Sequence, residues 1–212
     1  METVKRWFVT GIGTGIGKTI VSAVLAEHLK ADYWKPIQSG DLEQSDSMTI
    51  RNAVSYSIRI HPERYQLNTA VSPHQAAEMD NIYMRVSDFS VPESDNHLIV
   101  EGAGGLFVPI NSKEFMIDLI AKLDLALVVV VRDYLGCINH TILTLQAIVQ
   151  RKLRVAVVVF NGDFNPWTYA VLLDNIPQNI PFIHVPTLKQ VDKQHVKQCA
   201  DSIGLCDKAQ GV

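Results

Sequence analysis

Cysteine and charge are both scarce in this sequence of 212 residues. The three cysteines, Cys137, Cys199 and Cys206, form no C-x-x-C pair, which argues against a disulfide framework and against a zinc site. Charged residues make up 19% of the chain and the formal net charge is −3, so no general attraction to nucleic acid or to an anionic membrane is implied. This cysteine usage is typical of a reducing compartment, and we expect a cytoplasmic location.

Long hydrophobic runs are absent as well. The longest apolar run, residues 125–131, lies between Asp124 and Arg132 and is far shorter than the roughly 20 residues that a membrane-spanning helix needs. The first residues lack the apolar core of a signal peptide, so we expect none. Without repeats or low-complexity segments, the length fits one α/β domain over residues 1–212, at roughly 100–200 residues per domain.

A glycine-rich loop near the start of the chain is the most informative stretch. Residues 8–19 read FVTGIGTGIGKT, an apolar run followed by four glycines and then by Lys18 and Thr19. Backbone N–H groups of such a loop surround a phosphate, the lysine reaches the β- and γ-phosphates, and the threonine hydroxyl binds Mg²⁺. The positive end of the following helix faces the same charge. We therefore predict a phosphate-binding loop.

This loop departs from the standard phosphate-loop pattern by one residue. The pattern requires a glycine five places before Gly17, where Ile12 stands, and the nearest glycine is Gly11. The dinucleotide pattern G-x-G-x-x-G fits less well, because it requires a glycine where Ile16 or Lys18 stands. The remaining alternative is a glycine-rich turn between a strand and a helix that binds nothing.

Strands and helices are predicted to alternate along most of the chain. This order predicts an α/β fold with a doubly wound, mostly parallel sheet, helices on both faces and a phosphate-binding loop, as in P-loop NTPases. Residues 41–54 carry an amphipathic pattern with acids, and residues 55–69 look irregular. The predicted strands are 6–10, 31–34, 98–101, 125–131, 154–160 and 182–185, and the predicted helices are 18–30, 75–84, 114–124, a segment from 136, and 191–202.

Polar and glycine-rich segments follow several of these strands. The carboxyl ends of parallel strands meet at one edge of a sheet, where ligands bind in open α/β folds. We therefore expect one site to receive all of these segments. They are residues 11–19, 35–40, 101–105, 133–139 and Asn161.

An acid at the end of a strand beside the phosphate loop helps to hold Mg²⁺ in P-loop enzymes. Glu101 is our prediction for this acid, because the glycines that follow it allow the backbone to approach a ligand closely. Asp133, which follows the buried strand 125–131, is the alternative.

Asn161 is a candidate for reading a purine, because its amide offers both a donor and an acceptor. GTPases have a lysine after the corresponding asparagine, whereas this chain has Gly162. The sequence therefore favours adenine over guanine.

Several of these segments together resemble the dethiobiotin synthetase family of biotin biosynthesis, and the resemblance runs from Trp7 to about Leu188. The loop with its extra residue is similar to the ATP loop of that family. The family's loop commonly carries an acid where Gly15 stands and often one where Gly13 stands, so we expect no acidic role for this loop. The matching segments are 8–19, 35–40, 72–74, 100–105 and 136–140.

The resemblance implies an ATP-dependent cyclo-ligase. Such an enzyme converts 7,8-diaminononanoate, CO₂ and ATP into dethiobiotin, ADP and phosphate, through a carbamate and a carbamic–phosphoric mixed anhydride. It also implies Mg²⁺ as a cofactor and a homodimer with the substrate at the subunit interface, with neither nucleic acid nor membrane as a partner.

Residue roles also come from this resemblance. Lys18 and Lys35 would be catalytic, and Thr19, Asp46 and Glu101 would hold Mg²⁺. ATP would be bound by Gly15, Ile16, Gly17, Lys18, Thr19, Ile20, Asp46, Glu101, Gly102, Ala103, Gly104, Asn161, Pro186, Thr187 and Leu188. The diamine substrate would be bound by Thr14, Ser39 and, from the second subunit, Gly136, Cys137, Ile138 and Asn139.

Two other classes of ATP-dependent protein are alternatives. A partition- or targeting-type ATPase would have a signature lysine five places before the loop lysine, where Gly13 stands. An amide ligase acting on corrin-like acids would bring a glutamine-hydrolysing domain, which we do not expect within 212 residues.

Overall fold

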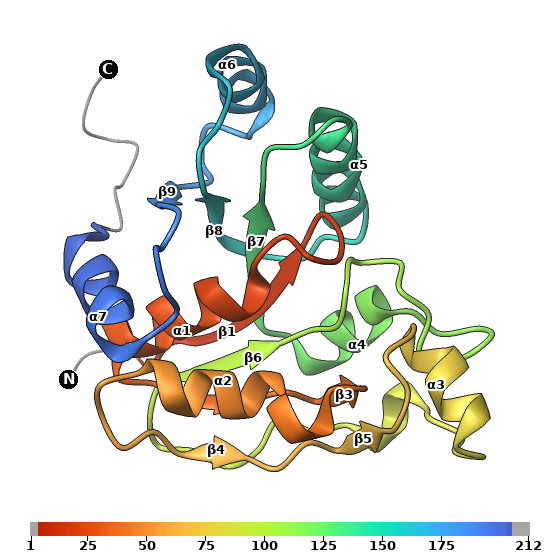
Figure 1. Ribbon diagram of the computed structural model, residues 1–212. Helices are drawn as coiled ribbons and strands as arrows, with labels where there is room; N and C mark the ends of the chain where they lie inside the picture. The colour runs from red at the N-terminus through yellow and green to blue at the C-terminus, as the bar shows by residue number, and fades with distance from the viewer. Residues whose placement is uncertain (1–3, 205–212) are drawn as a thin grey trace.

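A seven-stranded parallel sheet forms the middle of the computed structural model, which describes residues 4–204 (Figure 1). The strand order is β4-β2-β6-β1-β7-β8-β9, and each registered pair of neighbours is parallel. The doubly wound, mostly parallel fold predicted above is confirmed. The strands are β1 (Arg6–Gly11), β2 (Asp32–Trp34), β4 (Ile60–His61), β6 (Leu98–Glu101), β7 (Ala126–Val131), β8 (Val155–Asn161) and β9 (Phe182–Val185).

Helices cover both faces of this sheet. α1 packs against α2 and α7, and α5 packs against α6. Figure 1 shows α4 and α5 on the other side of the sheet from α1 and α7. The helices are α1 (Lys18–Leu29), α2 (Asp46–Ala53), α3 (Pro73–Met79), α4 (Met116–Leu123), α5 (Cys137–Gln150), α6 (Pro166–Asn175) and α7 (Lys193–Ser202).

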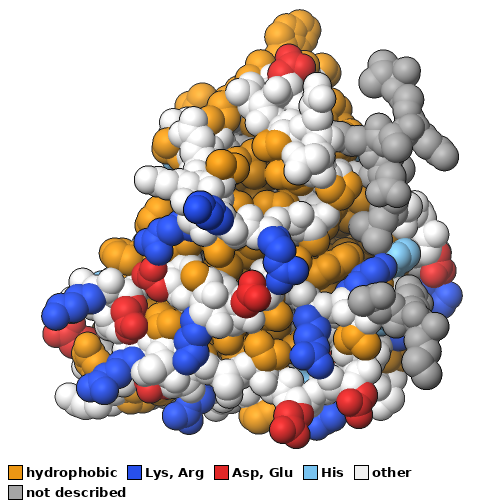
Figure 2. Space-filling view, turned by 180° about the vertical axis from the view of Figure 1, so that it is seen from behind, with side chains coloured by type: hydrophobic (Ala, Val, Ile, Leu, Met, Phe, Trp, Pro, Cys, Tyr) orange, Lys and Arg blue, Asp and Glu red, His pale blue; other side chains and the backbone are white. Residues whose placement is uncertain are grey.

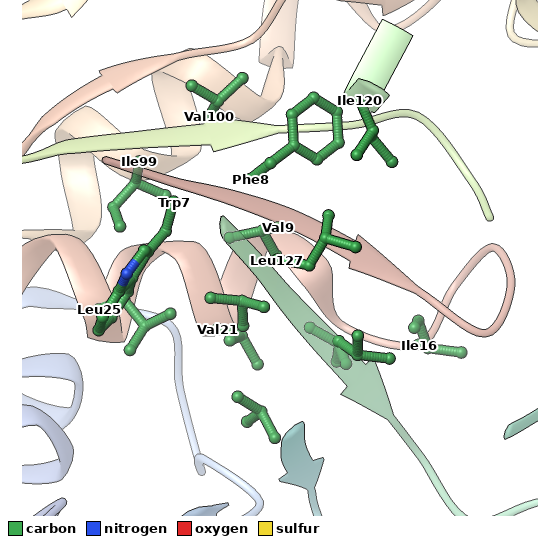
Figure 3. Close-up of a cluster of buried hydrophobic side chains, with 14 of the residues drawn as sticks. Trp7, Phe8, Val9, Ile16, Val21, Leu25, Ile99, Val100, Ile120 and Leu127 are labelled. Carbon is green, nitrogen blue, oxygen red and sulfur yellow. The ribbon is translucent and has the colours of Figure 1, made fainter. Parts of the chain in front are cut away.

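Successive residues of β1 point to opposite faces and so fill two apolar layers. Figure 3 shows Trp7 beside Leu25 of α1, whereas Phe8 lies beside Ile120 of α4. Phe8 and Ile120 are fully buried. Central strands are apolar on both faces because both are covered, and each fully buried large side chain contributes about 1.5–3 kcal/mol. This rigid core fixes the strand ends at which the polar segments begin.

The structure differs from the sequence prediction in three segments. The helix predicted over 75–84 is α3, which starts at Pro73 because proline suits a first helical turn, and ends before the left-handed Asn81 (φ 56). The segment expected to be irregular contains β4 and β5 (Tyr65–Leu67), and β5 pairs with β3 (Ile37–Ser39) in a second small sheet. α6 was not predicted, although Asn165 caps it and Pro166 follows, which is a usual helix start.

Charges of both signs alternate on the face of the molecule seen in Figure 2. Lysine, arginine and acidic side chains are interspersed over its lower half, and hydrophobic side chains are prominent in its upper part. Within residues 4–204, no helix is long and apolar enough to cross a membrane. Cys137 and Cys199 are buried free thiols, and Cys206 lies outside the described residues.

Candidate functional site

A cleft of about 770 Å³ opens at the carboxyl ends of β1, β2 and β6. It brings together three of the five segments that were expected to share one site, 11–19, 35–40 and 101–105. The expectation of one site for all five was wrong, because 133–139 and Asn161 do not line this cleft. Ser72 and Pro73, at the start of α3, also line it. The predicted site residues in its walls are Thr14, Gly15, Gly17, Lys18, Thr19, Ile20, Lys35, Ser39, Asp46, Glu101, Ala103 and Gly104.

The phosphate loop turns from β1 into α1 through two left-handed glycines. Gly15 has φ 73 and Gly17 has φ 88, conformations that side chains other than hydrogen disfavour. A Cβ at position 17 would also lie 2.1 Å from Nδ2 of Asn161. That amide nitrogen donates to the carbonyl of Ile16 at 2.8 Å, so the end of β8 holds the loop from behind. Lys18 Nζ donates to the carbonyl of Gly13 at 3.0 Å across the mouth of the loop.

Two carboxylates, a lysine and a threonine meet at the floor of the cleft. Lys35 Nζ lies 3.1 Å from Oε1 of Glu101 and forms an ion pair with Asp46. Thr19 Oγ1 lies 2.9 Å from Oδ1 of Asp46 and 2.9 Å from Oε1 of Glu101. The ends of β2 and β6 and the first turns of α1 and α2 therefore deliver all four side chains to one point.

Burial and charge together set the pKa values of these groups. Burial lowers the pKa of Lys18 to about 8, although Glu101 opposes this effect. Burial alone would also lower the pKa of Lys35, but the carboxylates of Glu101 and Asp46 outweigh it and raise that pKa. For Asp46, burial opposes ionisation, yet Lys35 holds its pKa below the ordinary value. Lys35 and Asp46 are therefore a charged pair at neutral pH.

The donor set at the cleft floor suits Mg²⁺. Mg²⁺ prefers oxygen ligands and at nucleotide sites uses one or two carboxylates together with substrate phosphates. Glu101 and Asp46 supply the carboxylates, and Thr19 supplies a hydroxyl. Within the described residues no cluster of three or more His, Cys, Asp or Glu side chains is placed to hold a metal. A metal here would thus rely on the phosphates for its remaining ligands.

Asp133, the alternative to Glu101 as the acidic ligand of Mg²⁺, does not line the cleft. Asp133 accepts hydrogen bonds from the backbone N–H of Asn165 at 2.7 Å and from Sγ of Cys137 at 3.5 Å. Its carboxylate therefore ties the starts of α5 and α6 together.

Several predicted residues lie outside the main cleft. Ile16 is buried under the loop, and Gly102 offers its carbonyl to Lys35 at 3.4 Å. Asn161 is 5% exposed at the end of β8. Pro186, Thr187 and Leu188 follow β9 and line a separate hollow beside α7.

The segment predicted to serve a second subunit begins α5. Gly136 has φ 106 and precedes the helix, Cys137 is buried, and Asn139 is exposed. None of residues 136–139 lines the cleft of its own chain. Their role in binding substrate therefore stays a prediction.

Three polar residues at the site were not singled out from the sequence. Gln38 accepts from the backbone N–H of Asp46 at 3.3 Å, and Arg132 Nη1 lies 3.4 Å from the carbonyl of Gly15. Tyr33 donates to Glu101 Oε2 at 2.9 Å. The one signal in the sequence for Gln38 is its position within the segment 35–40. No signal in the sequence indicated Tyr33, which lies within a predicted strand.

The fold and the loop are those of P-loop NTPases. A ParA family ATPase from Chlorobium tepidum superposes with a TM-score of 0.51 at 14% identity, over 93% of this chain and 98% of that one. The cell division protein MinD of Aquifex aeolicus superposes with a TM-score of 0.51 at 12% identity, over 93% and 95%. At these identities the likeness shows the fold alone.

Sequence comparison places the chain within this class. A family model described as an AAA domain matches residues 5–195. The chain is 49% identical to an ATP-dependent dethiobiotin synthetase of Christiangramia forsetii over 79% of this chain and 81% of that protein. It is 43% identical to one of Cytophaga hutchinsonii, over 91% and 93%. The chain therefore belongs to the ATP-dependent dethiobiotin synthetase family, and the predictions of this family and of an ATP-dependent ligase are confirmed.

Proposed function

We propose that the protein converts 7,8-diaminononanoate, CO₂ and ATP into dethiobiotin, ADP and phosphate in biotin biosynthesis. The observation that carries this proposal is the convergence of Lys18, Lys35 and two carboxylates in the cleft beside the phosphate loop. Membership of the dethiobiotin synthetase family supports the choice of substrate.

The chemistry requires three steps. One amine of the substrate adds to CO₂ and loses a proton, which gives a carbamate. A carbamate oxygen then attacks the γ-phosphorus of ATP, ADP leaves, and a carbamic–phosphoric mixed anhydride results. The second amine attacks the carbonyl carbon and expels phosphate, which closes the ureido ring. The protein contributes mainly position and positive charge, as in other phosphoryl transfers.

Lys18 and Lys35 supply that charge from two sides of the cleft. Lys18 lies at the start of α1, where its ammonium reaches the β- and γ-phosphates and releases the carbonyl of Gly13. Lys35 is 5% exposed, and its ammonium stabilises the carbamate and the migrating phosphoryl group. A fixed charge of this kind in a water-poor site contributes about 10²–10³ in rate.

ATP binding follows from the loop and its surroundings. Residues 15–20 and 102–104 surround the phosphates, and Thr19, Asp46 and Glu101 would hold Mg²⁺, which neutralises charge on the β- and γ-phosphates when bound. Asn161 and residues 186–188 lie at the ends of neighbouring strands, β8 and β9, and are proposed to hold adenine.

The diamine is proposed to bind between the cleft and a second subunit. Ser39 lines the cleft, and its buried hydroxyl has no hydrogen-bond partner within residues 4–204, so it is available to an amine or a carbamate. Thr14 also lines the cleft. The start of α5 in a partner subunit is proposed to present N–H groups of its first turn to the carboxylate of the substrate, although the N–H of Cys137 already donates to the carbonyl of Tyr134. We therefore propose a homodimer.

The test is phosphate release from Mg²⁺ and ATP with bicarbonate, with and without 7,8-diaminononanoate. Release that depends on the diamine, together with an equal amount of a ureido product, is the expected result. Release that is indifferent to the diamine would refute the proposal and favour an ATPase whose partner is another protein.

A further inference from the structure

Tyr33 is a buried polar side chain for which the proposed reaction has no use. It lies in β2, is 0% exposed, and donates its hydroxyl to Oε2 of Glu101 at 2.9 Å. A phenol hydroxyl in an apolar strand is costly to bury unless it is hydrogen-bonded. Phenylalanine would fill nearly the same space without that cost, so the hydroxyl points to a role at the carboxylate.

The register of the sheet explains why this tyrosine reaches Glu101. Tyr33 pairs with Ile99 and Trp34 with Val100 in the neighbouring β6, so the end of β2 runs alongside Glu101. Residues two apart in an extended chain share a face, which places Tyr33 and Lys35 on the same face of the sheet. Both side chains donate to Glu101, at 2.9 and 3.1 Å.

The two oxygens of Glu101 are thereby assigned to different tasks. Oε2 accepts from Tyr33, and Oε1 faces Thr19 and Lys35 in the cleft. Glu101 is 1% exposed, so water cannot readily take over either role.

We propose that Tyr33 is a positioning residue for the metal site, whose hydroxyl holds Glu101 with Oε1 turned toward the bound nucleotide. This inference rests on the proposed function, in which Glu101 is a ligand of Mg²⁺. Hydrogen-bond partners behind a metal ligand fix its orientation, and their loss costs about 10–100-fold in metal affinity or activity. Without the hydroxyl, Oε2 is free to compete for the metal, and the carboxylate loses its fixed rotamer.

The experiment compares binding of ATP with Mg²⁺ and binding of ATP with EDTA, by calorimetry and without the diamine. Tyr33→Phe keeps the aromatic ring and removes one oxygen, so the core stays filled. We expect this variant to bind ATP with EDTA as the wild type does, and to lose roughly tenfold in its affinity for ATP with Mg²⁺. Melting temperatures without ligand show that both proteins are folded.

Tyr56→Phe is the matched control, because it also removes a partly buried tyrosine hydroxyl. That hydroxyl donates to the backbone carbonyls of Ala26 and Ala31, away from the cleft. A loss of melting temperature with an unchanged ratio of the two ATP affinities is the result expected for a purely structural hydroxyl.

Three outcomes would overturn the role of Tyr33. They are an unchanged affinity ratio in Tyr33→Phe, an equal change in Tyr56→Phe, and a wild-type protein whose ATP affinity is indifferent to Mg²⁺. Turnover with the diamine is measured separately on the wild type. If the wild type shows no turnover with the diamine, the proposed reaction is refuted. If the wild type turns over but Tyr33→Phe has the same ratio of ATP affinities with Mg²⁺ and with EDTA as the wild type, only the positioning role is refuted.

Discussion

Replacement of Lys35 by methionine tests the electrostatic design of the cleft. Lys35→Met keeps a chain of similar length and removes the ammonium that lies between two carboxylates. Glu101 and Asp46 would then share the hydroxyl of Thr19 without the ammonium between them. We expect the variant to fold, to be less stable than the wild type, and to lose most of its turnover.

The size of the stability loss follows from burial. Lys35 and Glu101 are almost fully buried, and their ion pair spans 3.1 Å. Removing one partner of such a pair costs about 3–5 kcal/mol because a buried charge is left uncompensated. Asp46 is 31% exposed and keeps some contact with water, so we expect about 3 kcal/mol. For a chain of this size this corresponds to a fall in melting temperature of about 6–12 °C.

The assay has two parts. Thermal unfolding is followed by circular dichroism in EDTA and again in Mg²⁺, where the metal ion should restore part of the lost stability because it neutralises the same carboxylates. Turnover is followed as diamine-dependent phosphate release, and we expect a loss of at least about 10²-fold. Lys197→Ala is the control, because its pair with Asp201 is exposed and contributes less than about 1 kcal/mol.

Normal turnover by Lys35→Met would refute the catalytic role of this lysine. A melting temperature in EDTA within 2 °C of the wild type, a margin set from the roughly 2–4 °C per kcal/mol for chains of this size, would refute the electrostatic reasoning. It would mean that the carboxylates relax or take up a proton at little cost.

Three further predictions concern the loop, the metal site and acid stability. Gly17→Ala should abolish ATP binding in a calorimetric titration, because alanine disfavours φ 88 and its Cβ would lie 2.1 Å from Nδ2 of Asn161. Binding at wild-type affinity would contradict this. Glu101→Gln should remove the gain in ATP affinity from Mg²⁺ while Asp133→Asn retains it, and the reverse result would place the metal acid after β7. Burial tends to raise the pKa of Glu27, but hydrogen bonds from Lys30 and Ser55 lower it overall. The stability that this carboxylate contributes is present above its unfolded pKa of about 4.3 and is lost as the pH falls through the lower folded value. Urea midpoints of Glu27→Gln should therefore vary less with pH between about 5 and 3 than those of the wild type; equal slopes would show that Glu27 is not the group involved.

The phosphate loop and the class of fold were predictable because both depend on local pattern. Glycines at 15 and 17 are needed for left-handed backbone, whatever the rest of the chain does. Apolar runs such as β7 and β9 are typical of buried parallel strands, and β9 was predicted with its observed bounds. The short strands β4 and β5 were missed because strands of two or three residues are too short to show a hydrophobic periodicity.

By itself, the sequence determined the glycine-rich loop pattern, which strands are buried and to which family the chain belongs. The tertiary structure alone decided which side chains act together. Thr19 meets Asp46 and Glu101 across 27 and 82 positions of the chain, and Asn161 holds the loop across 145. Tyr33 became a candidate only when the register of β2 and β6 placed its hydroxyl on Glu101. Hydrogen bonds and ion pairs act over about 3 Å, and distances of that size between remote residues are set by sheet register and helix packing, which no local pattern of residues records.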